Sequence, residues 1–209
     1  GFQVERSQED FIKQVQEIGL SVIGQSDQLV LADKLLYALR DVTATVDTIP
    51  LIASSVMSKK IAAGADSILL DVTVGEGAFM KNIDDARVLA RTMVDLGKAV
   101  GRKTVAVLTD MSQPLGTSIG NRLEIIEALE ILQGKGREDI TTFICELAQI
   151  MLGLADVEKT VEEVREQLIN GAALKKFEAM VSAQGGDLEE LLYAYRHGII
   201  KEAERKKQE

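Results

Sequence analysis

The stretch from Leu36 to Met80, LYALRDVTATVDTIPLIASSVMSKKIAAGADSILLDVTVGEGAFM, decides the fold of this chain. It predicts the end of one helix and then a second helix with Pro50 in its first turn, where a missing N–H costs little. We expect the second helix to stop at Gly64, because glycine suits the left-handed conformation that often follows a helix. The apolar run over residues 67–72 then predicts a buried strand, which leads into the turn Gly75-Glu76-Gly77.

Two cations and a hydroxyl are expected near this turn. Ser55 and Lys59 are four residues apart, so they share one face of the second helix, and Arg40 falls at the end of the preceding helix. Ligands of open α/β sheets bind at the carboxyl ends of the strands. A guanidinium and an ammonium at that edge suit a small anionic or carbonyl-rich ligand, and the residue pattern alone leads no further.

The rest of the chain predicts an α/β fold with a parallel βαβ core and many helices. Residues 83–100 are strongly amphipathic and residues 104–109 form a second apolar run, so strand, helix and strand follow one another. Upstream, we expect a helix that begins near Gln8 with Ser7 as its cap, and a short buried strand over residues 20–24. Downstream, helices are predicted over residues 121–132, 137–153, 157–170, 172–183 and 188–209.

The composition excludes several classes of protein. The 209 residues are enough for one good-sized domain, and no apolar run approaches the ~18 residues that a membrane helix needs. Acidic residues outnumber basic ones by 33 to 24, which argues against a nucleic acid as partner. The single cysteine excludes an internal disulfide and, with no signal peptide visible, favours the reducing cytoplasm.

The segments LRDVTATVDTIPLIASSVMSKKIAAGAD and LLDVTVGEGAFM closely resemble the family of pyrimidine-nucleoside phosphorylases and thymidine phosphorylases. The resemblance runs from Gly1 to about Asp187, nearly the whole chain. The chain departs from the family at Thr73, where members usually have a lysine just before the glycine turn.

The resemblance implies that the chain is a piece of a longer protein. It begins with Gly1 rather than Met, and its opening residues resemble a mid-chain segment of family members, which are about twice as long. An upstream glycine-rich phosphate loop and a downstream β-rich region would then be missing, so we expect about half an active site and no activity from this piece alone. The implied domains are an edge of the α/β domain, part of a small all-helical lobe, the central α/β domain and a helical tail unlike the family, over residues 1–30, 31–65, 66–187 and 188–209.

The family cleaves pyrimidine nucleosides such as uridine, thymidine and deoxyuridine with phosphate, giving the free base and a (deoxy)ribose 1-phosphate. Negative charge grows on the departing base, so the site needs hydrogen-bond donors aimed at its carbonyl oxygens. The resemblance implies that Arg40 and Lys59 are these catalytic donors and that Ser55 binds the base edge. It also implies that the walls around the base ring are formed by Tyr37, Ile52 and Phe79.

A second set of residues is implied to hold a monovalent cation, potassium. Leu115 and Ser118 would supply backbone carbonyls and Glu127 a carboxylate, since hard cations take oxygen ligands. The resemblance further implies phosphate as co-substrate, no organic cofactor, and a homodimer that forms mainly through the helical lobe. Membranes and nucleic acids are not expected partners.

Two alternatives stay open. A phosphoribosyltransferase, such as the anthranilate enzyme, has a similar architecture, although the unbroken match around Arg40 and Lys59 argues against it. A non-catalytic, oligomerising fragment is the other alternative, and only a measurement of activity or binding separates it from an enzyme. The turn at Gly75–Gly77 lacks the spacing of a dinucleotide loop and a Walker lysine, and His197 is expected to be an ordinary surface residue.

Overall fold

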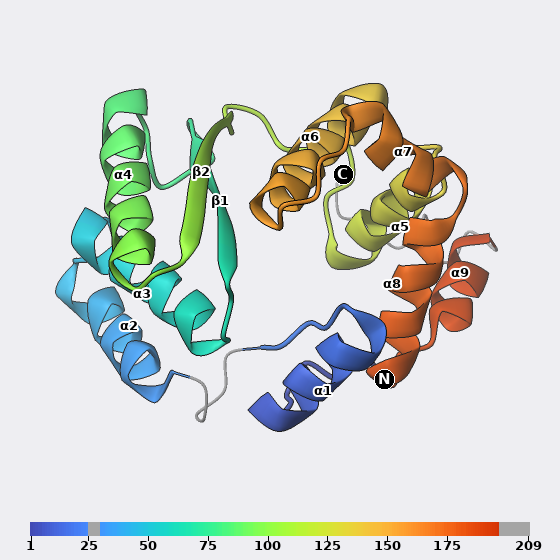
Figure 1. The fold of residues 1–209 in the computed structure, drawn as a ribbon, viewed down its shortest axis with the longest axis horizontal. Helices are drawn as coiled ribbons and strands as arrows, with labels where there is room; N and C mark the ends of the chain where they lie inside the picture. The colour runs from blue at the N-terminus through green and yellow to red at the C-terminus, as the bar shows by residue number, and fades with distance from the viewer. Residues whose placement is uncertain (25–29, 197–209) are drawn as a thin grey trace, which may run out of the picture. The chain divides into compact units, whose positions relative to one another are not determined.

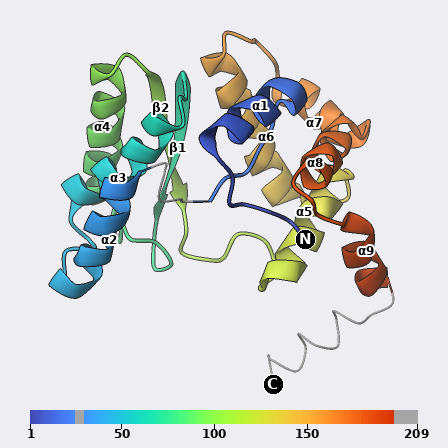
Figure 2. The same ribbon diagram turned by 90° about the horizontal axis from the view of Figure 1, so that it is seen from below.

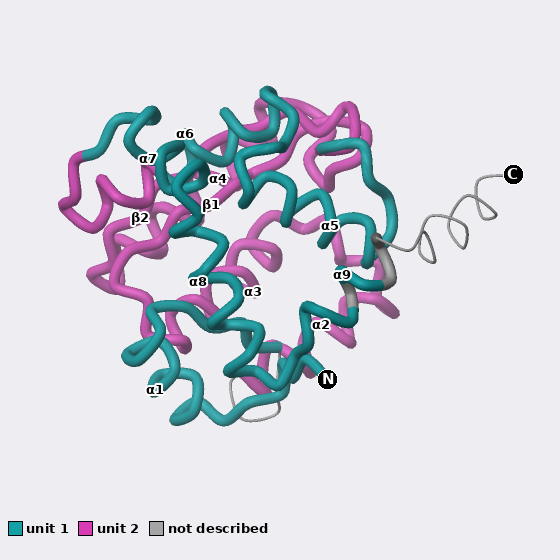
Figure 3. Tube along the Cα trace, turned by 90° about the vertical axis from the view of Figure 1, so that its right-hand side faces the viewer, with its two compact units in different colours: residues 1–24, 116–148, 159–209 teal, residues 25–115, 149–158 magenta. Residues whose placement is uncertain are grey.

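The computed structural model describes residues 1–24 and 30–196, which form two compact units (Figure 3). Unit 1 comprises residues 1–24, 116–148 and 159–209, and unit 2 comprises residues 25–115 and 149–158. The domain boundaries implied by the family resemblance are not tested by this division and stay a prediction.

Unit 2 contains a parallel pair of strands, as the sequence predicts. Strand β1 (Ser67–Val74) pairs with β2 (Lys103–Asp110) from Ser67 opposite Lys103 to Val74 opposite Asp110. Helix α4 (Ile83–Ala99) connects them and packs against both strands (Figure 1). The α/β fold with a βαβ unit is therefore confirmed.

The core of unit 2 lies where α3 (Ile49–Ala62) and α4 meet the strands. Alternate residues of β1 point into it, which is the period that a strand covered on one face requires. The apolar stripe of α4 faces the same core with the helical period. The buried residues of this core are Ala53, Met57, Ile68, Leu70, Val72, Met80, Ala86, Leu89, Ala90 and Met93.

Helix α2 (Leu31–Thr43) packs against α3 and reaches three residues beyond the predicted end at Arg40. Ala44 follows it in the left-handed conformation, with φ of 53°, and turns the chain toward α3. Pro50 occupies the first turn of α3, and Gly64 has φ of 83°, so both signals at the ends of α3 acted as predicted.

Unit 1 is helical in its described part. It contains α1 (Gln8–Ile18), α5 (Asn121–Leu132), most of α6 (Glu138–Leu154), α7 (Val161–Ile169), α8 (Ala172–Ala183) and α9 (Leu188–Arg196). Helix α1 lies beside α8 (Figures 1 and 2), and α5 contacts α7, α8 and α9. Ser7 caps α1 as predicted. Helix α7 starts later than the predicted residue 157, because Thr160 and Glu163 form a capping box there.

The predicted strand over residues 20–24 is wrong, because this segment has no strand partner and runs as an irregular chain. Its hydrogen bonds come from the Gln184 side chain and from the backbone of Val4 instead. Gln184 accepts from the Val22 N–H at 2.9 Å and donates to the Val22 carbonyl at 2.8 Å, while the Gly24 N–H donates to the Val4 carbonyl at 2.8 Å. The buried Gln184 amide therefore pairs the Val22 N–H and carbonyl, which a neighbouring strand would otherwise pair.

Among the described residues, none of the helices combines the length and apolar character that crossing a membrane requires. Helix α9 confirms the start of the helix predicted over residues 188–209. The rest of that prediction, with His197, lies outside the described residues.

Candidate functional site

Helices α2 and α3 bring four of the predicted site residues together within unit 2. On α2, Tyr37 and Arg40 are three residues apart and so lie on one face of the helix. On α3, Ser55 and Lys59 are one turn apart. The polar side chains meet where the two helices pack, and the cluster also contains Asp33, one turn before Tyr37.

All three N–H groups of the Lys59 ammonium have a partner in this cluster. Lys59 Nζ lies 2.6 Å from Asp33 Oδ2, and it donates to Ser55 Oγ at 2.9 Å and to the Ser55 carbonyl at 3.2 Å. Lys59 keeps 35% of its side chain exposed, whereas Asp33 keeps only 11%. The ammonium is therefore fixed in position and still reachable from solvent.

Arg40 is buried, with 5% of its surface exposed, and clamps the connection between α2 and α3. Its Nε donates to the Thr45 carbonyl at 3.4 Å, Nη1 donates to the Leu51 carbonyl at 3.2 Å, and Nη2 donates to the Val46 carbonyl. A guanidinium has five N–H groups, so at least two are left for another acceptor. The fork therefore shapes the connection, and these three contacts leave two of its N–H groups unused.

The Tyr37 ring lies beside both cations. Its centroid is 5.0 Å from Arg40 Cζ and 5.9 Å from Lys59 Nζ, within the range of cation–π attraction. Tyr37 is 38% exposed, so it is partly packed in the cluster and partly open to solvent. This position agrees with the predicted role of Tyr37 as a wall beside a ligand, which stays a prediction.

Sequence reasoning missed Asp33, the carboxylate of the cluster. Burial alone would raise the pKa of Asp33, but hydrogen bonds from Lys59 and Ser55, together with the charges of Lys59 and Arg40, hold it below the usual value. The signal was present in the sequence, because Asp33, Tyr37 and Arg40 follow one another at helical spacing on α2.

Ile52 and Phe79, the other two predicted wall residues, line a hollow of about 280 Å³ alongside β1. The hollow is also lined by Val56, Lys60, Met80 and residues 69–73. Burial, and then the neighbouring charge of Lys59, lower the pKa of Lys60. Phe79 itself is 61% exposed, so its ring is available to a ligand.

The glycine turn after β1 packs closely against the loop after β2. The Gly75 N–H donates to the Met80 carbonyl, and the Gly77 N–H donates to the Met111 carbonyl, each at 3.0 Å. Gly75 has φ of 137°, and a Cβ there would lie 2.5 Å from the Ser112 nitrogen. Only glycine fits this position, so the turn is fixed by its close packing against the loop after β2.

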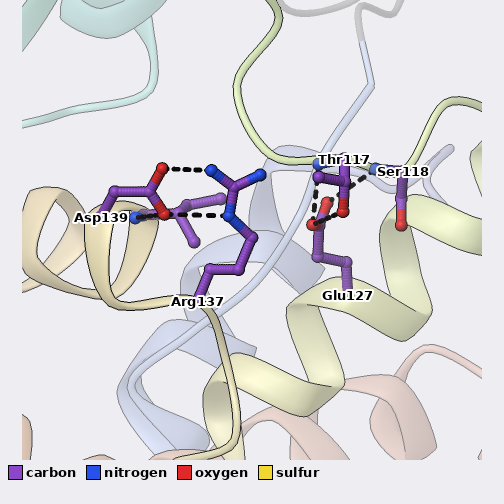
Figure 4. Close-up of polar contacts among 6 residues, drawn as sticks. Thr117, Ser118, Glu127, Arg137 and Asp139 are labelled. Atoms are coloured by element: carbon purple, nitrogen blue, oxygen red, sulfur yellow. Dashed lines mark hydrogen bonds and ion pairs between the residues drawn. The ribbon is translucent and has the colours of Figure 1, made fainter.

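Within unit 1, Glu127 on α5 fastens the loop that precedes this helix (Figure 4). Oε1 accepts from the Thr117 N–H at 2.9 Å and from the Thr117 hydroxyl at 3.1 Å, while Oε2 accepts from the Ser118 N–H at 3.3 Å. Burial raises the pKa of Glu127, but these hydrogen bonds and the charge of Arg137 outweigh it, so the pKa lies below its usual value.

These hydrogen bonds limit how the predicted cation could be held. Both lone pairs of Oε1 are used, so Glu127 could offer a cation only one lone pair of Oε2. Leu115 belongs to unit 2, so only Ser118 and Glu127 meet within one unit. The described residues contain no group of three or more His, Cys, Asp or Glu side chains arranged to hold a metal.

The βαβ fold and the cluster of donors beside it agree with the comparison to known families. The pattern of the family described as "Glycosyl transferase family, a/b domain" matches residues 1–174. The chain belongs to this family.

The names of individual relatives are more specific than the description of the family. The chain is 57% identical over 192 residues to a pyrimidine-nucleoside phosphorylase of Staphylococcus haemolyticus (strain JCSC1435). It is 56% and 54% identical over 191 residues to proteins of the same name from Staphylococcus epidermidis (strain ATCC 12228 / FDA PCI 1200) and Staphylococcus aureus (strain USA300). Each match covers 90% of this chain and 44% of the relative, so the chain spans less than half the length of these curated relatives. The resemblance seen in the sequence is thereby confirmed.

Proposed function

We propose that this chain serves in the phosphorolysis of pyrimidine nucleosides, within a protein as long as its relatives. Phosphate attacks the anomeric carbon of uridine, thymidine or deoxyuridine, the glycosidic bond breaks, and the products are a free base and a (deoxy)ribose 1-phosphate. The observation that carries the proposal is the 57% identity to a protein of that name over 90% of this chain. The meeting of Tyr37, Arg40, Ser55 and Lys59 in one cluster supports it.

The cluster suits the charge that develops in this reaction. As the glycosidic bond breaks, negative charge collects on the carbonyl oxygens of the base, and donors already held in place stabilise it without reorganising. Arg40 has donors to spare and is held by three backbone carbonyls. Lys59 has none to spare, so we propose that a base oxygen replaces one of its two contacts with Ser55 while the pair with Asp33 persists.

The remaining parts of the reaction stay predictions. Phosphate is the proposed co-substrate, its glycine-rich loop is expected in sequence beyond this chain, and no organic cofactor is proposed. Potassium at Ser118 and Glu127 and a cytoplasmic location stay predictions as well. Tyr37, Ile52 and Phe79 are proposed to surround the base ring, because all three are available at the surface of unit 2.

The experiment is an assay of uracil release from uridine with and without phosphate, for the 209-residue chain and for the intact protein that contains it. We expect release only from the intact protein and only with phosphate. Lys59→Ala should lower kcat by about 10²- to 10³-fold, the usual cost of one such donor. The control is Lys98→Ala, which removes an exposed lysine from the end of α4 and should leave kcat unchanged.

Each outcome is informative. Phosphate-dependent release by the 209-residue chain that Lys59→Ala abolishes would support the activity and show that the site is complete here. Failure of the intact protein to release uracil in the presence of phosphate would refute the proposal. Transfer that requires a phosphoribosyl pyrophosphate instead would favour the phosphoribosyltransferase.

We also propose that the protein forms a homodimer through α2. This helix exposes a row of large apolar side chains, and such a surface usually marks an interface. Its most exposed members are Leu35, Leu36, Leu39 and Val42, from 55% to 80% exposed. Light scattering of the intact protein should give the mass of a dimer, and Val42→Glu should shift it toward the monomer; a monomeric wild-type protein would contradict the proposal.

A further inference from the structure

The Lys59 ammonium is held from two helices. Its contacts with the Ser55 hydroxyl and the Ser55 carbonyl come from its own helix, one turn back, whereas Asp33 approaches from α2. A lysine side chain has a flexible four-carbon stem, so contacts from α3 alone would fix the ammonium less firmly. The contact of 2.6 Å with Asp33 therefore holds the ammonium against α2, beside the Tyr37 ring that also lies against Arg40.

The charges of this cluster do not cancel. Arg40 and Lys59 are positive and Asp33 is negative, so the cluster carries one net positive charge. The three backbone carbonyls that hold Arg40 are neutral acceptors, and they leave its charge uncompensated. Asp33 keeps only 11% of its side chain exposed, so solvent screens its charge weakly. The neighbouring Lys60 lines the hollow beside β1 and is unchanged in every variant compared below.

The proposed reaction sets a requirement on this charge. The base of a nucleoside is neutral when it binds, and it gains one negative charge as the glycosidic bond breaks. One net positive charge balances that negative charge as it develops, and only such a gain in the transition state raises the rate. A second uncompensated cation would also strengthen the binding of any pyrimidine that is already anionic, including the departing base.

We propose that Asp33 is a specificity-determining residue of the base site, because it holds Lys59 in place and limits the cluster to one net positive charge. Its carboxylate weakens the binding of anionic pyrimidines relative to neutral ones. An ion pair that served only to join α2 to α3 would not change this relative affinity. The inference rests on the proposed function, since the base is expected to bind at this cluster.

The experiment measures the binding of two pyrimidines to the intact protein by isothermal titration calorimetry. Uracil is neutral at neutral pH, whereas 5-nitrouracil is anionic there, because its nitro group makes the ring more acidic. The readout is the affinity for 5-nitrouracil divided by the affinity for uracil, compared between each variant and the wild type. A loss of packing between α2 and α3 would weaken both affinities alike and leave this ratio unchanged.

The variants change the net charge of the cluster in opposite directions. Asp33→Asn keeps the size of the side chain and removes its charge, so it should raise the ratio by about tenfold. Lys59→Met should lower the ratio by about tenfold, and the double variant, which again carries one positive charge, should return it to within about threefold of the wild type. Asp33→Glu keeps the charge, and Asp41→Asn removes an exposed carboxylate of α2, so each should leave the ratio within about twofold.

A ratio in Asp33→Asn that stays within about twofold of the wild type, or a double variant that matches Lys59→Met, would overturn the proposal. Should Asp33→Asn fail to fold, the double variant supplies the same test, because neither member of the pair is then left as an unpaired charge. An intact wild-type protein that binds neither pyrimidine would also overturn it. Failure of the wild type to release uracil from uridine with phosphate refutes the proposed function, whereas normal release with an unchanged ratio refutes only the role of Asp33.

Discussion

Replacing Asp33 by Asn should weaken the packing of α2 against α3 by an amount that the structure allows us to work out. Two unit charges 2.6 Å apart attract by about 1.6 kcal/mol in a medium with the dielectric constant of water. The desolvation of Asp33 opposes this attraction, whereas the lower dielectric constant around the Asp33 carboxylate strengthens it. The partial exposure of Lys59 lets solvent screen the attraction. We therefore expect Asp33→Asn to lower the free energy of unfolding of unit 2 by about 1–2 kcal/mol.

The assay is a double-mutant cycle with Asp33→Asn, Lys59→Met and the two together. Urea unfolding should be followed through NMR signals of α2 and α3, so that only unit 2 contributes. The coupling energy should be about 1–2 kcal/mol at neutral pH. Asp41→Asn is the control, because Asp41 is an exposed carboxylate of the same helix, and its loss should change stability by less than about 0.5 kcal/mol.

The pH dependence gives an independent check. The pKa of Asp33 is lower in the folded state than in the unfolded chain, so the stabilisation is complete above the unfolded value and is lost as the pH falls through the folded one. The coupling should therefore be constant from about pH 7 to 5 and should decline below about pH 4. A coupling under about 0.3 kcal/mol, or Asp33→Asn as harmless as Asp41→Asn, would refute the reasoning.

Two further substitutions test the packing, one in each unit. Gly75→Ala should destabilise unit 2 by about 2–4 kcal/mol in thermal unfolding, because the added Cβ would lie 2.5 Å from the Ser112 nitrogen. The control, Gly101→Ala, should cost about 1 kcal/mol, because Gly101 has a positive φ but open space around it; equal losses would contradict the close approach at Gly75. Gln184→Met keeps the size of a buried side chain but leaves Val22 unpaired, so it should cost about 2–3 kcal/mol and speed exchange of the Val22 amide; unchanged exchange would show that Gln184 is not its partner.

Much of the fold follows from short-range patterns. Helices α5 and α8 have the predicted bounds, and β1, α4 and β2 differ from the predictions by two residues or fewer at each end. Their signals are local, since caps, a proline, glycines at helix ends and the period of apolar residues act within a few residues of one another. The start of α7 is also set by a local signal, because the capping box of Thr160 and Glu163 places it after the predicted residue 157.

The candidate site could be predicted as a set of residues but not as a set of contacts. The spacing of Ser55 and Lys59 determined that they share a face, and the family resemblance named Arg40 and Tyr37 beside them. The sequence could not show that Arg40 donates three hydrogen bonds to backbone carbonyls, nor that Asp33 forms an ion pair with Lys59. Those contacts depend on how α2 and α3 meet.

The sequence by itself therefore determined the elements, the parallel βαβ order and the family. Only the tertiary structure decided which polar groups satisfy one another. The clearest case is the segment at residues 20–24, whose apolar pattern predicts a strand but whose backbone is paired by Gln184, 162 residues from Val22 along the chain. Local propensity determines which backbone conformations are low in free energy. A hydrogen bond between distant residues forms only where folding brings the two groups within reach.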